Sequence, residues 1–283
     1  MSRESLRNKK PIRLSVLSDV KRVLRKGKLH TVCEESKCPN IGECFANNTA
    51  TFLIMGKVCT RGCRYCSVKK GMPKPLNPAE PKNLAKAAKE LGLKYIVITS
   101  VTRDDLVDGG ASHFASCIRE IKREIPDAKV EVLTPDFRGK TDLVDIVLRE
   151  NPFVFNCNIE TVERLYPKIR LGGRYEWTLN LLRYSKKNYP RIWTKSGLIV
   201  GLGETWEDIR KTLEDLREAG CDILTVGQYL QPTKRQLPVF KEYTEEEFEK
   251  IKDLAGELGF KYTFAGRWVR SSYRAWEVVA KAL

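Results

Sequence analysis

Two cysteine triplets within the first seventy residues constrain this chain more than any other feature of its sequence. The first has the spacing C-x4-C-x5-C and consists of Cys33, Cys38 and Cys44. The second has the spacing C-x3-C-x2-C and consists of Cys59, Cys63 and Cys66. Three thiolates hold three irons of a four-iron, four-sulfur cluster and leave the fourth iron without a protein cysteine. The spacing therefore predicts two clusters, each with one coordination position open to another ligand.

The use of cysteine favours a reducing compartment over a disulfide scaffold. The chain has nine cysteines in 283 residues, and its first thirty residues contain no apolar segment typical of a secretory signal. We therefore expect metal or redox chemistry and a cytoplasmic location. A zinc site usually has four ligands and a ferredoxin-type carrier usually has a fourth cysteine, so both are weaker interpretations of the second triplet. Cys117 and Cys221 occur singly and are expected to be ordinary buried thiols.

Short apolar runs that alternate with amphipathic stretches predict an α/β fold. The expected strands are 51–55, 95–100, 130–134, 153–156, 197–202 and 223–229. The expected helices are 83–91, 112–125, 141–150, 160–166, 175–188, 205–219 and 244–258, and Thr205 and Thr244 begin capping boxes. Strands that alternate with helices pair in parallel, and six units are too few to close an eight-stranded barrel. We therefore predict an open, partial (β/α)6 barrel of parallel strands.

The chain is expected to have three parts. Residues 1–50 form a basic arm and the segment of the first triplet, residues 51–260 form the partial barrel, and residues 261–283 form a C-terminal extension with a final helix over 273–282. Residues 1–30 carry ten Lys and Arg against two acidic residues, a local charge of +8 within a net charge of +15. Such an arm suits a nucleic acid, an anionic membrane or an acidic protein, or it is solvated without a dedicated partner. No apolar run is long enough to span a bilayer.

The second triplet lies directly after the first expected strand, in the segment CTRGCRYC. In parallel α/β folds the active site forms at the carboxyl ends of the strands, so this loop lies on the catalytic face. The C-x3-C-x2-C spacing with an aromatic residue before the last cysteine resembles the radical S-adenosylmethionine superfamily. The resemblance implies a cluster, held by Cys59, Cys63 and Cys66, whose open iron binds the amino and carboxylate groups of S-adenosylmethionine. An electron from that cluster cleaves the cofactor and gives a radical that abstracts hydrogen.

Several further residues are expected on the same face as contacts of S-adenosylmethionine. They are Tyr65, Asp108, Gly109, Gly110, Asn156, Asn158, Glu160 and Gly201. Small residues allow backbone to approach a bound ligand closely, and the stretch GLIVGLGE at 197–204 resembles the adenine-side motif of the superfamily. Ordinary turns and polar surface loops explain the same residues when each is taken alone.

The first triplet has a more specific resemblance when it is combined with the second and with Arg270-Ser271-Ser272-Tyr273. This set resembles the lipoyl synthase family, as do SVTRDDLVDGG (100–110), KSGLIVGLGE (195–204) and LTVGQYLQPT (224–233). The resemblance implies a sulfurtransferase that inserts two sulfur atoms at C6 and C8 of an octanoyl chain linked to a lysine of a carrier protein. The auxiliary cluster on Cys33, Cys38 and Cys44 supplies the sulfur.

The resemblance also implies a serine ligand to the auxiliary cluster. A seryl oxygen is a harder ligand than thiolate and suits a bond that must release. We expect Ser272 to be this ligand, with Ser271 as the alternative. A serine in this position also suits the N-cap of the expected final helix.

Partners follow from the same resemblance. They are an octanoylated lipoyl domain of a dehydrogenase E2 subunit or a glycine-cleavage H protein, an electron donor such as ferredoxin or flavodoxin, and a cluster-delivery protein. A membrane has no role in this interpretation, and nucleic acid is disfavoured. The basic arm suits an acidic carrier, and the segment Arg164–Arg174 is expected to add positive charge near the active face.

Two positions depart from the family pattern. Cys157 lies where a histidine usually separates two asparagines, and Gln236 lies where a histidine usually precedes Leu-Pro. These departures bear on substrate contacts and not on the cluster cysteines, although Cys157 is also considered as a stray cluster contact.

Two other functions remain open at this stage. A two-cluster methylthiotransferase acting on RNA agrees with the positive charge, but the chain shows no appended RNA-binding domain. A metal-dependent nucleic-acid-binding module without catalysis is the alternative from a different class. Metal content separates these hypotheses, because two four-iron clusters contain about eight irons and two zinc sites contain none.

Overall fold

The computed structural model describes residues 14–35, 51–272 and 275. One sheet of eight strands forms its centre, in the order β1-β2-β5-β6-β7-β8-β9-β10. The strands are β1 His30–Thr31, β2 Thr51–Ile54, β5 Tyr95–Ser100, β6 Lys129–Leu133, β7 Val154–Asn156, β8 Trp193–Val200, β9 Ile223–Gln228 and β10 Tyr262–Gly266. Neighbours from β2 to β10 all pair in parallel, and β1 pairs antiparallel with β2 at one edge.

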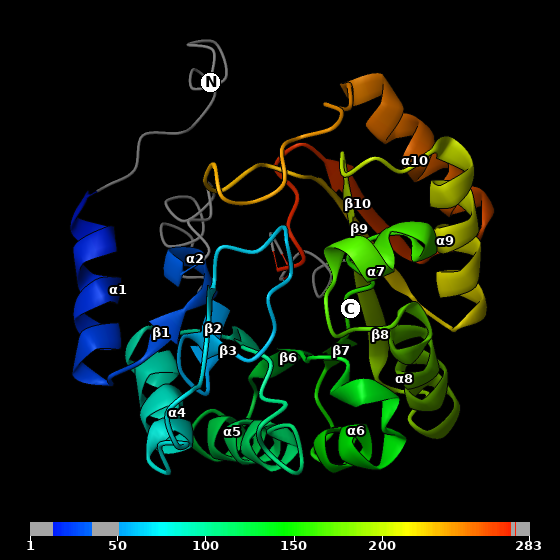
Figure 1. The fold of residues 1–283 in the computed structure, drawn as a ribbon. Helices are drawn as coiled ribbons and strands as arrows, with labels where there is room; N and C mark the ends of the chain where they lie inside the picture. Colours follow the sequence, from blue (N-terminus) through cyan, green and yellow to red (C-terminus); the bar gives the residue numbers. More distant parts are fainter. Residues whose placement is uncertain (1–13, 36–50, 273–274, 276–283) are drawn as a thin grey trace.

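Helices cover the outer side of this curved sheet. Figure 1 shows the larger helices arranged as an arc around it, with α1 beside the β1 edge. The helices are α1 Leu14–Lys26, α2 Val32–Glu35, α4 Glu80–Glu90, α5 Ala111–Glu124, α6 Thr141–Leu148, α7 Tyr166–Ile169, α8 Tyr175–Asn188, α9 Trp206–Glu218 and α10 Glu245–Glu257. The alternation of strand and outer helix confirms the predicted α/β class with a mostly parallel, open sheet.

The six predicted strands are all present, and each is followed by an outer helix, as predicted for six β/α units. β10, which pairs in register with β9 from Ile223 to Gly227, adds a seventh parallel strand. Four of its five residues are only half-buried, so its sequence lacks the continuous apolar character of a central parallel strand. This strand lies in the segment that we expected to be a C-terminal extension. The helix α1 was likewise missed, because its many basic residues suggested an arm.

The predicted helices are confirmed at six of seven positions within a few residues. Thr205 and Thr244 form complete capping boxes, with Asp208 and Glu247 as the reciprocal partners. The expected helix at 160–166 was wrong in position, because the chain there forms a 3-10 turn, Glu163–Leu165, followed by the short α7. The helix expected at 83–91 begins earlier, at Glu80, where Pro81 occupies a first-turn position.

The core lies between the sheet and the outer helices. α5 illustrates its origin, because Phe114, Ile118 and Ile121 recur at helical spacing and are all fully buried. Each such side chain contributes about 1.5–3 kcal/mol to folding when it leaves water. Cys117 and Cys221 are also completely buried, as expected for structural thiols. Among the described residues, no helix has both the length and the apolar character needed to cross a bilayer.

Candidate active site at the cysteine loop

The second triplet occupies a loop between two very short strands. Cys59 ends β3 (Val58–Cys59), which pairs in parallel with β4 (Lys69–Lys70), and Cys63 and Cys66 lie in the connection. A backbone hydrogen bond from Gly71 to the carbonyl of Cys59 closes the base of the loop. All three thiols line one cavity of about 550 Å³. The sequence prediction that these cysteines act together therefore has a geometric basis.

The loop backbone fits an iron–sulfur cluster. The N–H of Arg61 donates to Cys59 Sγ at 3.4 Å, and the N–H of Val68 donates to Cys66 Sγ at 3.4 Å. Hydrogen bonds to the ligating sulfurs are a usual means of tuning such clusters. In the described part of the chain, no three His, Cys, Asp or Glu side chains converge on a single metal ion. A four-iron cube does not require that convergence, because each thiolate bonds a different iron.

The protein alone does not stabilise thiolates in this loop. Burial raises the pKa of the Cys66 thiol to about 12. Burial also raises the pKa of Cys63, although the nearby guanidinium of Arg170 opposes that effect. Bound iron supplies the positive charge that deprotonates such thiols, as it does for metal-coordinating cysteines in general.

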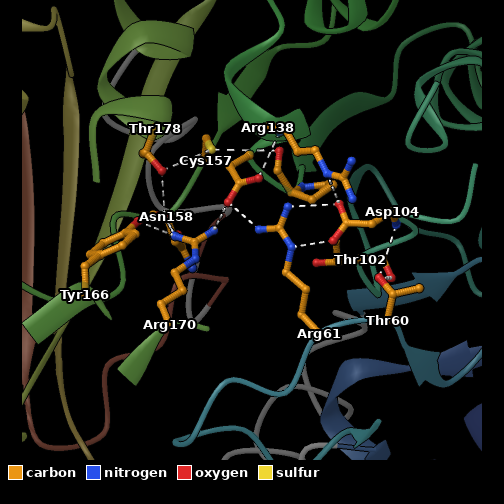
Figure 2. A network of polar contacts seen from close by, with 12 residues as sticks. Thr60, Arg61, Thr102, Asp104, Arg138, Cys157, Asn158, Tyr166, Arg170 and Thr178 are labelled. Carbon is orange, nitrogen blue, oxygen red and sulfur yellow. Dashed lines mark hydrogen bonds and ion pairs between the residues drawn. The ribbon is translucent and has the colours of Figure 1, made fainter. Parts of the chain in front are cut away.

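A buried network of arginines and aspartates holds the loop in place, and the sequence did not reveal it (Figure 2). Arg61, inside the cysteine loop, donates from Nε and Nη2 to Asp104 at 2.7 and 3.0 Å. Its Nη1 donates to Asp136 Oδ2 at 2.6 Å. Asp104 follows β5 and Asp136 follows β6, so one arginine ties the loop to two strand ends. Burial by itself would lower the pKa of Arg61. The hydrogen bonds and ion pairs with the two carboxylates outweigh this effect and raise the pKa.

Arg170 extends this network to the end of β7. Its Nη1 donates to the Asn158 carbonyl at 2.6 Å, and its Nη2 lies 3.4 Å from the same Asp136 oxygen that Arg61 contacts. Figure 2 shows Arg61 and Arg170 next to each other in this network. We expected the segment 164–174 to add positive charge near the active face, and Arg170 does so, because its guanidinium acts on the thiol of Cys63. Arg170 is buried, and Arg164 is paired with Asp208 at 2.6 Å.

Tyr65 and Glu160 lie close to the cysteines on another side of the loop. Burial raises the pKa of Glu160, and Arg170 opposes that rise. Burial, followed by the negative charge of Glu160, raises the pKa of Tyr65 well above its ordinary value. Glu160 has a positive φ of 67° and is held by a backbone bridge to Leu198 of β8. A strained backbone that points a buried carboxyl toward the cysteine loop is typical of a functional position.

The two predicted asparagines are engaged by the serine segment. Asn156 Nδ2 donates to Ser271 Oγ at 2.8 Å, and Ser271 Oγ donates to Asn158 Oδ1 at 2.9 Å. Asn158 Nδ2 in turn donates to Glu160 Oε1 at 3.1 Å. The Ser272 hydroxyl makes no hydrogen bond to the residues that the structure describes. The two serines therefore differ, and sequence alone gave no way to separate them.

The remaining predicted cofactor contacts have local structural explanations. The Asp108 carboxylate accepts the N–H groups of Gly110 and Ser112, both at 3.0 Å, at the start of α5. Gly110 has a φ of 90°, and a side chain there would collide with Met55 at the end of β2. A side chain at Gly201 would likewise collide with Gln228. These contacts explain the glycines without a ligand, and the cofactor roles remain predictions.

The two departures from the family pattern occupy different surroundings. Cys157 is fully buried, and its sulfur contacts the Thr178 hydroxyl at 3.9 Å and the Pro135 carbonyl at 4.0 Å. None of its hydrogen-bond partners in the described chain belongs to the cysteine loop. Gln236 does touch that loop, because its Nε2 donates to the Cys66 carbonyl at 3.3 Å.

The structure describes only part of the first triplet. Cys38 and Cys44 lie outside the described residues, as does the expected helix at 273–282. Cys33 belongs to α2, whose last residue, Glu35, accepts a hydrogen bond at its carbonyl from Ser67 Oγ at 3.4 Å. The chain that leads into the first triplet therefore lies beside the second one.

Comparison with known proteins agrees with this site. The model of the radical SAM superfamily matches residues 53–216. The chain is 55% identical to the lipoyl synthase of Aquifex aeolicus over 269 residues, which is 95% of this chain and 98% of that protein. It is also 55% identical to the lipoyl synthase of Caldicellulosiruptor bescii, over 92% of this chain and 89% of that protein.

Solved structures that resemble this one share its fold. Methylornithine synthase PylB has a TM-score of 0.57 at 16% identity, over 76% of this chain and 70% of that one. Streptococcus suis SuiB, solved with S-adenosylmethionine, has a TM-score of 0.59 at 14% identity, over 76% of this chain and 49% of that one. Both similarities show the fold alone. The identity to curated relatives and the match to the superfamily model show that this chain belongs to the lipoyl synthase family of radical S-adenosylmethionine enzymes.

Proposed function

We propose that Cys59, Cys63 and Cys66 hold the catalytic cluster of a lipoyl synthase that inserts sulfur at C6 and C8 of a protein-bound octanoyl-lysine. The observation that carries this proposal is the single cavity lined by all three thiols, with backbone N–H groups directed at two of the sulfurs. When bound, the cluster and S-adenosylmethionine supply the electron and the radical that remove hydrogen from the octanoyl chain.

The residues around the loop orient and enclose these groups. Arg61 and Asp136 fix the loop against the strand ends, so that the three sulfurs keep their spacing during turnover. Tyr65 and Glu160 offer a hydroxyl and a carboxyl beside the cysteines, and a carboxylate suits the positive amino and sulfonium groups of S-adenosylmethionine. Asn156, Asn158 and the backbone of Asp108, Gly109, Gly110 and Gly201 complete the proposed contacts of that cofactor.

The auxiliary cluster is the sulfur substrate, and we assign it to Cys33, Cys38, Cys44 and Ser272. The difference between the two serines supports the choice of Ser272. Ser271 already donates one hydrogen bond and accepts another, whereas the Ser272 hydroxyl has no partner in the described part of the chain. Ser271 then acts as a positioning residue that holds the segment against β7. A weak bond from a seryl oxygen suits a cluster that gives up its sulfur.

The partners follow from the chemistry. The carrier is an octanoylated lipoyl domain of a dehydrogenase E2 subunit or a glycine-cleavage H protein. A ferredoxin or flavodoxin supplies electrons, and a cluster-delivery protein rebuilds the auxiliary cluster after each turnover. In the same proposal residues 1–50 carry the auxiliary cluster, 51–260 the partial barrel and 261–283 the serine segment, with β10 continuing the sheet beyond residue 260.

The experiment is anaerobic incubation with an octanoyl-lysine peptide, S-adenosylmethionine and a reductant, followed by mass spectrometry. We expect a gain of two sulfur atoms and about eight irons per chain before turnover. Changing Cys33, Cys38 or Cys44 to alanine should stop sulfur insertion and leave cleavage of S-adenosylmethionine measurable. Lipoyl product from those variants would disprove the assignment of the auxiliary cluster. One zinc per triplet would remove the enzymatic interpretation altogether.

A further inference from the structure

The mouth of the cysteine cavity has an unusual charge distribution. Four of its lining residues are cations with exposed side chains: Arg64, Lys69, Lys70 and Arg235. No acidic residue among those that the structure describes lines this cavity. We call these four residues the basic rim. Because the same cavity reaches all three cysteine sulfurs, the basic rim surrounds an opening that leads directly to the catalytic cluster site.

The described part of the chain does not neutralise the basic rim. None of its four side chains forms an ion pair with a residue in the described ranges 14–35, 51–272 and 275. Some exposed cations elsewhere are paired, as Arg164 is with Asp208 at 2.6 Å. Unpaired charges of one sign around an opening add to a common field, which attracts an oppositely charged partner.

The proposed cofactor contacts and the serine segment lie apart from the cavity at the basic rim. Tyr65, Glu160 and Ser271 do not line the cavity at the basic rim. Arg64 shows how the loop holds a residue of the basic rim. Its backbone N–H donates to Ile169 of α7, its carbonyl accepts from Leu237, and its charged side chain is exposed. A protein that reaches the cysteines across the basic rim therefore does not have to pass the proposed cofactor contacts or the serine segment.

Apolar surface beside the basic rim adds a second feature of an interface. Leu237 and Pro238 line the same cavity, and Met72, which follows β4, is 83% exposed. Methionine is enriched in protein interfaces, and small patches of apolar surface with a charged border are typical of transient electron-transfer complexes. The combination fits a protein partner better than a free small anion, which would need only the charge.

We propose that the basic rim docks an acidic, low-potential one-electron carrier protein. This inference rests on the proposed function, because the carrier gives one electron to the cluster held by Cys59, Cys63 and Cys66. The carrier is oxidised by one electron, the bound cluster is reduced by one, and no proton or chemical group is transferred. Charge complementarity at the rim raises the association rate more than it raises affinity.

Charge reversal at the basic rim tests the proposal. The variant is Lys69→Glu combined with Arg235→Glu, because Lys70 packs across Gly62 and is better left in place. The control is Lys187→Glu combined with Arg191→Glu, which makes the same change in charge at two exposed positions. Arg191 lies two residues before β8, at the amino ends of the strands, so the control pair lies at the opposite end of the sheet.

The measurement is the rate of S-adenosylmethionine cleavage at low salt with increasing reduced flavodoxin as the acidic probe. We expect the half-saturating flavodoxin concentration to rise about tenfold or more in the rim variant and to stay within about twofold of the parent in the control. Added salt should raise the half-saturating flavodoxin concentration of the parent and leave that of the rim variant nearly unchanged. Rates with reduced methyl viologen, a cation, and with dithionite, an anion, should both stay within about twofold of the parent protein.

Several results would overturn the proposal. An unchanged flavodoxin dependence in the rim variant would do so, as would an equal loss in the control pair. If the rim variant bound the octanoylated lipoyl domain more weakly but bound flavodoxin as the parent does, the basic rim would be a docking surface for the lipoyl domain instead. Failure of the parent protein to cleave S-adenosylmethionine with either small reductant would instead contradict the proposed function, on which this inference depends. Iron content and the visible absorption of the cluster show whether each variant is correctly loaded.

Discussion

The cysteine loop at 59–66 and the serine segment at 267–272 both lie near the carboxyl ends of the strands, yet they are held very differently. The cysteine loop is tied by Arg61 to two carboxylates and through Asp136 to Arg170, all with little exposure to water. The serine segment is held by the hydroxyl of Ser271 between two asparagines and by the close approach of Val269 to Gly227. Its next hydroxyl, on Ser272, is left without a partner in the described chain.

In the proposed assignment, this difference corresponds to the fate of the two clusters. A catalytic cluster is used repeatedly, so a rigid loop that preserves its geometry is an advantage. An auxiliary cluster is consumed, so a ligand with one weak bond and few supporting contacts can release it. The buried ion pairs of the cysteine loop are also costly to form, and they persist where every charge has a partner. We therefore expect substitutions in the two regions to have different consequences.

The largest effect is expected at the catalytic cysteines. Changing Cys59, Cys63 or Cys66 to alanine should abolish cleavage of S-adenosylmethionine, because two thiolates do not retain the cluster. Product analysis by chromatography measures this directly. Cys221→Ala, which alters a buried thiol far from the loop, should retain cleavage and serves as the control. Retained cleavage in any of the three variants would refute the assigned ligand.

The next effect separates the two serines. Ser272→Ala should reduce sulfur insertion by about tenfold or more while cleavage of S-adenosylmethionine continues, because only the auxiliary cluster loses a ligand. Ser271→Ala should have a smaller effect on the iron content of the auxiliary site, since it removes a positioning contact. Iron analysis and Mössbauer spectroscopy of the unreacted protein distinguish the variants. The opposite order of effects would move the ligand to Ser271.

A third prediction concerns the stability that the cysteine loop receives from its ion pairs. Arg61→Ala should lower the free energy of unfolding by about 3–5 kcal/mol, because Asp136 is left buried with a weakened set of partners. Arg138→Ala is the matched control. It removes an exposed arginine that also contacts Asp104, at 3.2 Å, and should cost less than about 1 kcal/mol. Urea unfolding of both variants under anaerobic conditions tests the difference, and equal losses would contradict it.

The smallest effect is a dependence on pH. Burial acts to raise the pKa of Asp104, but its hydrogen bonds and charge pairing with Arg61 prevail and lower it. A carboxyl group with a lowered folded pKa stabilises the protein fully above its ordinary value of about 4, and this contribution is lost as the pH falls through the folded pKa. The melting temperature of the parent should therefore fall more steeply below about pH 4 than that of Asp104→Asn. Parallel curves would show that Asp104 contributes no pH-dependent stability.

Some features of the fold were predictable because they depend on neighbours in sequence. The six apolar runs, the capping boxes at Thr205 and Thr244, and the spacing of each cysteine triplet all express local geometry. β10 was not predictable in this way, because a half-buried edge strand has a weak pattern and is defined by its partner β9. α1 was missed for a similar reason, since a strongly basic composition hid its apolar face.

The sequence by itself determined the chemistry of this protein, because cluster ligands must be cysteines at fixed spacing and those spacings are visible in one dimension. The tertiary structure decided which residues support that chemistry. Arg61, Asp104, Asp136 and Arg170 are far apart in the chain, and only the convergence of strand ends brings their charges together. It also decided the different surroundings of the two serines, because neighbouring hydroxyl groups differ only in what the folded chain places beside them.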